Sequence, residues 1–310
     1  MELSINLINQ FNLFNNTKSS VPDYLFVTDL HGHVDRYRQL FELILSERPA
    51  VVLLGGDLLP HAYFSTRLNG KASHDFVSDF LVPELNKLRK RLKSEYPKVI
   101  LIMGNDDTRI HESAFIKYAQ SGIWEYLHFR SITLDKYQFY GYSYVPPTPF
   151  TLKDWEKYDV SRFVDPGCIS PEEGYRTVAV PGEEIRYGTI QQDLEKLTEG
   201  KELHQSIFLF HSPPYQTVMD RADLDGQLID HVPLDVHVGS IAIKRFIEAR
   251  QPHITLHGHV HESSRLTGAW RQKIGRTHLF SAACEAPELA VIRFHPDQPG
   301  EARREILSLE

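Results

Sequence analysis

The sequence predicts a protein of the α/β class, and two observations carry that prediction. Five short runs of apolar, mostly β-branched or aromatic residues each end directly in Gly, Asp, Asn or His. These runs span residues 24–28, 50–54, 99–103, 206–210 and 253–256. Segments with apolar residues at helical spacing lie between them. Strands that alternate with helices are typical of a sheet covered by helices on its faces.

The apolar runs are continuous rather than alternating, which predicts strands buried on both faces. Residues 137–144 instead alternate aromatic with small or polar side chains, which predicts a half-buried strand. Residues 277–294 predict two further strands near the end of the chain.

Three segments carry helical spacing. Apolar residues within 35–47 lie on one helical face, and those within 76–92 predict a longer helix bent at Pro83. Ser240 is a good N-cap for a helix that continues to about Arg250, where Pro252 stops it.

The 310 residues are expected to form a single domain, residues 1–310, with an inserted loop region at about 146–188. The segment 212–239 is a second long loop, and loops of that length in compact domains are usually functional or disordered.

Composition excludes several classes. The chain has 34 Lys and Arg against 41 Asp and Glu, a net charge of −7, which argues against a general nucleic-acid binder. Its two cysteines, Cys168 and Cys284, form no CxxC pair, which argues against a disulfide scaffold or thiolate metal site. No apolar stretch is long enough to span a membrane, and residues 1–20 show no secretory signal. We therefore expect a cytoplasmic protein.

The polar residues that follow the five runs predict a site with two metal ions. In α/β sheets, ligands gather beyond the carboxyl ends of the strands. In extended backbone, residues two apart such as Asp29 and His31 point to the same side, so they can share one ion. The seven candidate ligands are Asp29, His31, Asp57, Asn105, His211, His259 and His261.

Seven N and O donors without sulfur are too many for one tetrahedral ion. They suit two divalent ions such as Mn²⁺, Fe or Zn²⁺, with one carboxylate bridging them. Asp57 and Asn105 each follow a glycine, which allows a tight backbone turn there.

These residues resemble the pattern of the calcineurin-like metallophosphoesterases, which is D-x-H, GD, GN[H/x][D/E], H and GHxH. The matching segments are Asp29-Leu-His31, Gly56-Asp57, Gly104-Asn105-Asp106-Asp107, His211 and Gly258-His259-Val-His261. They occur in the family's order between about residues 23 and 263, and the segments around His211, His237 and Gly258 look like one prokaryotic branch.

The resemblance implies two stacked mixed β-sheets flanked by helices, the four-layer sandwich of the metallo-dependent phosphatases. It also implies one ion held by Asp29, His31 and His261, a second held by Asn105, His211 and His259, and Asp57 as the bridge. A bridging hydroxide at such a dinuclear centre would attack a phosphoester in line, without a covalent enzyme intermediate.

One position departs from the family pattern. Members with the strongest general acid have His after the Asn, whereas this chain has Asp106 followed by Asp107. An Asp does not simply replace an imidazole that donates a proton near pH 7. The proton could come from His33, His111 or His237, or from Asp106 itself if burial raises its pKa. Arg109 and His111 are candidates for gripping the phosphate.

The departure favours phosphodiesters or activated esters as substrates. The expected partner is a small phosphoester, and nucleotides are among the candidates. The alternative is a non-catalytic metal-binding scaffold or interaction protein on the same fold, since fold does not guarantee function. A nuclease is a third option, and the acidic charge argues against it. The sequence sets no oligomeric state.

Overall fold

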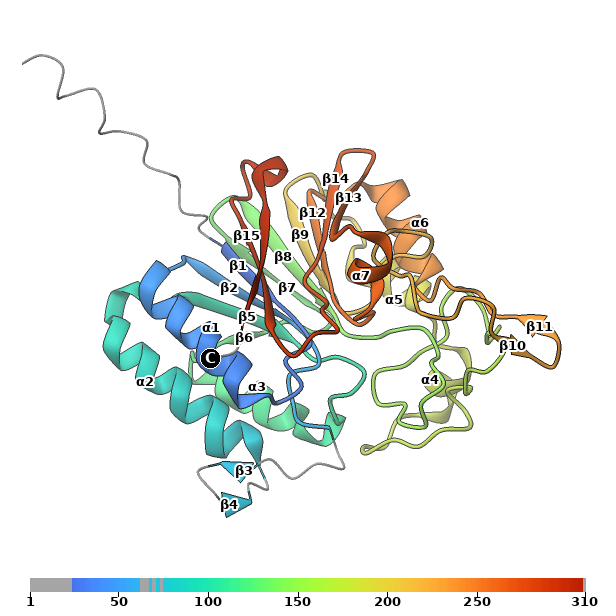
Figure 1. Ribbon diagram of the computed structural model, residues 1–310, viewed down its shortest axis with the longest axis horizontal. Helices are drawn as coiled ribbons and strands as arrows, with labels where there is room; N and C mark the ends of the chain where they lie inside the picture. The colour runs from blue at the N-terminus through green and yellow to red at the C-terminus, as the bar shows by residue number, and fades with distance from the viewer. Residues whose placement is uncertain (1–23, 62–66, 69–70, 73–74, 309–310) are drawn as a thin grey trace, which may run out of the picture.

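Two six-stranded mixed β-sheets face each other, and helices cover their outer faces (Figure 1). The computed structural model describes residues 24–61, 67–68, 71–72 and 75–308. The predicted α/β architecture of two stacked mixed sheets flanked by helices is therefore confirmed. The expectation about a secretory signal in residues 1–20 lies outside the described residues.

The first sheet has the strand order β16-β15-β1-β2-β5-β6. Strands β1, β2, β5 and β6 are parallel, whereas β15 pairs antiparallel with β1 and with β16. The bounds are β1 Tyr24–Val27, β2 Val51–Gly55, β5 Lys98–Ile102, β6 Glu125–Tyr126, β15 Leu289–Phe294 and β16 Arg303–Leu307. Its helices are α1 Val34–Glu47, α2 Val82–Leu92 and α3 Glu112–Gln120.

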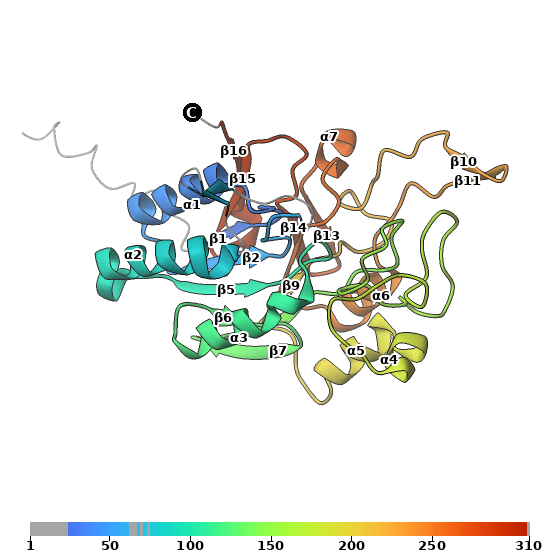
Figure 2. The ribbon, with the colours of Figure 1, turned by 90° about the horizontal axis from the view of Figure 1, so that it is seen from below.

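The second sheet has the strand order β13-β14-β12-β9-β8-β7, with the central four strands parallel. Its bounds are β7 Arg130–Leu134, β8 Tyr137–Tyr142, β9 Ser206–Phe210, β12 Ile254–His257, β13 Arg271–Ile274 and β14 Thr277–Ser281. Helices α5 Ile190–Leu197 and α6 Ile241–Arg250 lie on its other side (Figures 1 and 2).

Short elements complete the chain between these layers. They are β3 Arg67–Leu68, β4 Lys71–Ala72, α4 Gly182–Tyr187, β10 Leu228–Ile229, β11 Val232–Pro233, α7 Ser263–Thr267, the π-helical turn Val77–Leu81 and the 3₁₀ turns Lys93–Glu95, Arg109–His111 and Pro299–Glu301. No described helix is long and apolar enough to cross a membrane.

The apolar runs are buried on both faces because each strand separates two cores. In β1, Leu25 and Val27 belong to the core under the helices, whereas Tyr24 and Phe26 belong to the core between the sheets. Alternate side chains of one strand point to opposite faces, so both sets must be apolar. The prediction of strands buried on both faces is confirmed for these runs.

Strand β8 differs from its prediction as a half-buried strand. It lies between β7 and β9, and all its residues except Gln138 are buried. Tyr140 stacks on Phe208 of β9 with ring centroids 4.6 Å apart, and Tyr142 donates through its hydroxyl to Asp193 of α5 at 2.8 Å. The hydroxyl of Tyr137 also donates, to Asp297, whereas that of Tyr140 is buried without a hydrogen-bond partner among the described residues. The alternation therefore came from large aromatic residues that are buried together with their polar ends.

The helix predicted over residues 76–92 changes type in its middle. The π-helical turn Val77–Leu81 runs into α2, and Pro83 occupies the first turn of α2. The backbone stays helical through this point, since Val82 N–H donates to Val77 O, so Pro83 lies inside a continuous helical run at the place where the helix type changes.

The segment 146–188 is irregular apart from α4, and a buried polar network holds it. Lys153 pairs with Glu156, both fully buried, and Lys153 also donates to the carbonyl oxygen of Thr148 at 2.9 Å. Asp154 accepts from the backbone N–H of Arg109 at 2.7 Å, which ties the segment to the loop after β5. These polar contacts add to the burial of Trp155 and Tyr158, which lie in the same segment.

Candidate functional site

The carboxyl ends of strands from both sheets meet at one place. The backbone N–H of His259, after β12 in the second sheet, donates to Asp29 Oδ1, after β1 in the first sheet, at 3.1 Å. The ring of His211, directly after β9, donates from Nδ1 to the carbonyl oxygen of Gly55 in β2 at 2.9 Å. The site thus lies at the seam between the two sheets.

Four of the predicted ligands form one group. Asp29, His31, Asp57 and His261 each offer a ligand atom, and these atoms all lie within 4.8 Å of one another. His31 Nε2 lies 3.2 Å from His261 Nε2 and 3.9 Å from Asp57 Oδ2. His261 Nε2 lies 3.4 Å from Asp29 Oδ1.

The other three predicted ligands form a second group, which meets Asp57 through His211. His211 Nε2 is 3.2 Å from Asp57 Oδ2 and 3.0 Å from Asn105 Oδ1. The ring of His259 has its centroid 5.3 Å from that of His211. The structure therefore brings all seven residues together, with Asp57 in contact with both groups.

Left-handed backbone aims these side chains. Asp29, His31, Asp57 and His259 have φ values of 56°, 46°, 51° and 73°. The prediction that extended backbone turns Asp29 and His31 to the same side is therefore wrong. Such conformations cost roughly 1–3 kcal/mol each in non-glycine residues and cluster at functional sites. Backbone bonds hold them here: Asp29 N–H donates to Gly56 O at 3.0 Å, and His31 N–H to Asp57 O at 2.8 Å.

The two glycines before Asp57 and Asn105 act in different ways. Gly56 has φ 100°, as a tight turn requires, and a Cβ there would lie 2.6 Å from His211 Nδ1. Gly104 has no positive φ, but a Cβ there would lie 2.5 Å from the backbone nitrogen of Asp57. The expected tight turn is present at Gly56, whereas Gly104 is required by close approach of the two loops.

The charges of the cluster balance one another. Burial alone raises the pKa of Asp57, but His211 and His31 outweigh it and hold the pKa well below its usual range. Burial lowers the pKa of His211 and His261, but the nearby aspartates raise it to about 10 and about 9. Burial lowers the pKa of His259 to about 3. In the absence of a metal ion, two protonated imidazoles thus compensate two buried carboxylates.

The donor set fits divalent metal ions. Asp29 Oδ2 is fully buried and has no hydrogen-bond partner among the described residues. An unpaired buried carboxylate oxygen is costly unless a cation compensates it. Imidazole and carboxylate donors suit Mn²⁺, Fe and Zn²⁺, and binding an ion would displace the protons of His211 and His261.

The two aspartates after Asn105 have different surroundings. Asp106 lies at the rim, with Oδ2 3.7 Å from His31 Nδ1, and burial together with Asp57 and Asp107 raises its pKa to about 7. Asp107 is fully buried and accepts from the backbone N–H groups of Leu58, Leu59 and Gly104 at 2.7–3.1 Å. Asp107 therefore positions the loops after β2 and β5.

The four remaining residues proposed as proton donors or phosphate-binding residues lie outside the group of seven donors. His33 is exposed at the N-terminus of α1, and the half-buried His111 directly precedes α3. Arg109 donates to Glu112 and Tyr144, both at 2.9 Å, and packs over a tryptophan ring.

His237 is the fourth of these candidates. Its Nδ1 lies 2.9 Å from the buried carboxylate of Asp220, and its ring meets Tyr215 edge-on. Asp220 also accepts from the backbone N–H groups of Gln216, Thr217 and Gly239, which closes the 212–239 loop. Sequence reasoning did not identify Asp220, because no spacing marks it.

Arg36 is a second residue that sequence reasoning missed. It is buried on α1 and donates to the carbonyl oxygens of Asp29, Ala286 and Pro287 at 2.6–2.9 Å. It therefore holds the strained turn that carries Asp29. The available signal was an arginine beside Tyr37 on the apolar face of a predicted helix.

Comparisons with known proteins agree with this geometry. The family model described as calcineurin-like phosphoesterase matches residues 23–263. No curated protein matches the chain significantly. One solved structure, that of TT1561 from Thermus thermophilus, is 14% identical with a TM-score of 0.50, and the match covers 93% of this chain and 100% of that one. A second solved structure is also 14% identical, with a TM-score of 0.54, and the match covers 92% of this chain and 98% of that one. These structures show that the fold is shared.

Proposed function

The chain belongs to the calcineurin-like phosphoesterase family, a family of metal-dependent hydrolases, and from that premise we propose that it hydrolyses phosphodiesters or activated phosphoesters. The observation that carries the proposal is the group of seven N and O donors around Asp57. Relatives on this fold that bind no metal would be expected to lose such donors, because a cluster of buried polar groups is costly when no ion compensates it.

Asp29, His31 and His261 would hold one ion and Asn105, His211 and His259 the other, with Asp57 between them. When bound, two divalent ions supply positive charge for the phosphate and a water activated for attack on phosphorus. The nitrogen and oxygen donors favour Mn²⁺, Fe or Zn²⁺, and we take Mn²⁺ as the working choice.

The chain itself fixes the orientation of its donors. The carbonyl oxygen of Gly55 accepts from His211 Nδ1, so His211 Nε2 is the nitrogen directed at Asp57 and Asn105. Such outer hydrogen bonds set the tautomer and ring orientation of a metal-binding histidine. Arg36 and Asp107 play the same positioning role for the loops that carry Asp29, Asp57 and Asn105.

Protonation of the leaving group decides the class of ester. Asp106 occupies the place of a proton-donating histidine, and cations beside it would lower its raised pKa and leave it ionised. His237, oriented by Asp220, is the candidate alternative donor, and Arg109 and His111 are the candidate phosphate-binding residues. We therefore propose esters with good leaving groups, nucleotide diesters among them.

Rates for a series of aryl phosphodiesters test the proposal on Mn²⁺-reconstituted protein. We expect hydrolysis that falls steeply as the pKa of the leaving group rises, and a shallower dependence in Asp106→His. A wild-type dependence as shallow as that of the variant would show that an efficient acid is already present. Absence of hydrolysis with both ions bound would favour the non-catalytic scaffold, the reading that Asp106 supports.

The state of the two cysteines indicates the kind of cellular compartment in which the protein resides. Cys168 and Cys284 are both free, as in proteins of reducing compartments. We propose a cytoplasmic location on this basis, to be checked by fractionation.

A further inference from the structure

A hollow of about 390 Å³ lies between the start of α3 and the segment that precedes α4. Figure 1 shows these two segments facing each other across the lower part of the molecule. Its volume lies within the range of about 300–1,000 Å³ typical of small-molecule sites. Most of its lining is apolar, from Ile110, Ile116, Val178, Ala179, Val180 and Pro181.

Hydrogen bonds join the two walls of the hollow at one end. The buried carboxylate of Asp154 accepts from the backbone N–H of Arg109 at 2.7 Å and of Thr177 at 2.8 Å. The backbone N–H of Ile110 donates to the hydroxyl of Thr177 at 3.0 Å. The walls are therefore fixed relative to each other before any ligand binds, which lowers the entropic cost of binding.

The joined end of the hollow is close to the donor cluster. Arg109 follows Asp106 by three residues, and three residues span at most about 11 Å of chain. Asp106 itself lies 3.7 Å from His31. The backbone of Arg109 is therefore at most about 11 Å from that of Asp106, and this is the distance that a group attached to a phosphate at the cluster would bridge to enter the hollow.

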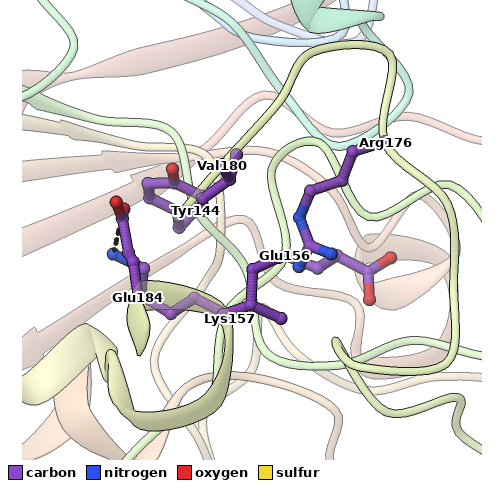
Figure 3. Close-up of a pocket in the computed structure, with 7 residues that line it drawn as sticks. Tyr144, Glu156, Lys157, Arg176, Val180 and Glu184 are labelled. Carbon is purple, nitrogen blue, oxygen red and sulfur yellow. Dashed lines mark hydrogen bonds and ion pairs between the residues drawn. The ribbon is translucent and has the colours of Figure 1, made fainter. Parts of the chain in front are cut away.

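The charged groups around the hollow are already compensated. Arg109 pairs with Glu112 at 2.9 Å. Glu184, which also lines the hollow, pairs with Lys157 of the adjoining crevice at 3.3 Å (Figure 3). Arg109 is the one cationic side chain among the described residues that line the hollow, and Glu112 already pairs with it. An uncharged apolar group, by contrast, would displace water from the apolar wall.

We propose that this hollow binds the organic group of the phosphoester, an uncharged and largely apolar group such as an aromatic ring. The inference rests on the proposed function, since the phosphate must lie at the metal cluster. It makes the segment 146–188 a determinant of substrate specificity rather than only a structural insertion.

Two phosphonates with the same headgroup test the proposal: methylphosphonate, which is compact, and 2-naphthylphosphonate, which carries the apolar group. Calorimetric titration of the Mn²⁺-loaded protein should show at least tenfold tighter binding of 2-naphthylphosphonate. Ser113→Trp, at an exposed position that lines the hollow, should remove this preference and leave the affinity for methylphosphonate unchanged. Gln120→Trp adds the same side chain at an exposed position on the same helix outside the lining and should keep the preference.

Equal affinity of the wild type for the two phosphonates would overturn the inference, as would a preference that survives in Ser113→Trp. Hydrolysis of bis-p-nitrophenyl phosphate is measured in parallel. Because the phosphonates are not hydrolysed, the binding preference is decided independently of turnover, and a lack of turnover counts against the proposed function alone.

Discussion

Asp57 contacts both groups of donors, and its charge compensates that of the protonated His211. Asp57→Asn keeps the shape and removes the charge, so we expect kcat/KM to fall by about 100-fold or more and the bound metal to decrease. Metal content by elemental analysis and aryl diester hydrolysis check this. Asp35→Asn, an exposed carboxylate on α1, is the control. Wild-type activity in Asp57→Asn would refute the assigned role.

His257 makes stability depend on pH. It is buried between the carbonyl oxygen of Ser212 and the hydroxyl of Thr255, and burial lowers its pKa to about 4. The unfolded chain binds this proton with a pKa of about 6.5. The neutral, buried form of His257 therefore contributes stability that is fully present above pH 6.5 and is lost as pH falls through 4.

Denaturant titrations at several pH values test this contribution. We expect the free energy of unfolding of the wild type to fall more steeply between pH 6.5 and 4 than that of His257→Gln, by up to about 1.4 kcal/mol per pH unit. The exposed His204→Gln should follow the wild type. Parallel curves for wild type and His257→Gln would contradict the argument.

Residue types and order in the sequence were enough to identify the seven donors that the structure brings together. The left-handed backbone at Asp29, His31 and Asp57 was not predictable, because it depends on hydrogen bonds between two loops far apart in the chain. The roles of Arg36 and Asp220 were missed for the same reason: each acts on backbone groups that no local pattern reveals.

At the scale of elements, α6 begins where the sequence predicted. Ser240 accepts from the backbone N–H of Ile243 at 3.0 Å, and its hydroxyl donates to Asp159 at 2.6 Å. Ser240→Ala should lower the free energy of unfolding by about 1–2 kcal/mol, as for other N-caps. Urea denaturation measures this, with Ser46→Ala, an exposed serine inside α1, as a control near zero. Equal losses in both variants would argue against a specific cap.

Central strands were predictable and edge strands were not. The five continuous apolar runs became β1, β2, β5, β9 and β12, which lie inside the two sheets. The strands β7, β13 and β16 lie at sheet edges, and their exposed residues are mostly charged or polar. Charged side chains on edge strands hinder pairing with other chains, and the same feature makes such strands resemble surface loops in a sequence.

At the scale of the whole molecule, metal should stabilise the fold. A ligand that binds only the folded state contributes RT ln(1 + [L]/Kd), about 2.7 kcal/mol at a hundredfold excess over Kd. The donors come from segments that the chain separates by up to 232 residues, from Asp29 to His261, so the unfolded chain does not preserve the site. We expect the melting temperature to rise with added Mn²⁺ and to fall with chelator. A melting temperature that does not respond to Mn²⁺ would indicate that the donors hold no ion.

The position of the cluster at the seam has a mechanical consequence. Each sheet carries only part of the donor set, and the sheets touch through an apolar layer that includes Ile102, Phe139 and Leu209. Any shift of one sheet against the other therefore changes the distances between donors that come from different sheets. Packing in the layer between the sheets therefore sets the spacing of the donors. Substitutions in that layer are expected to change the properties of the metal site although they touch no substrate.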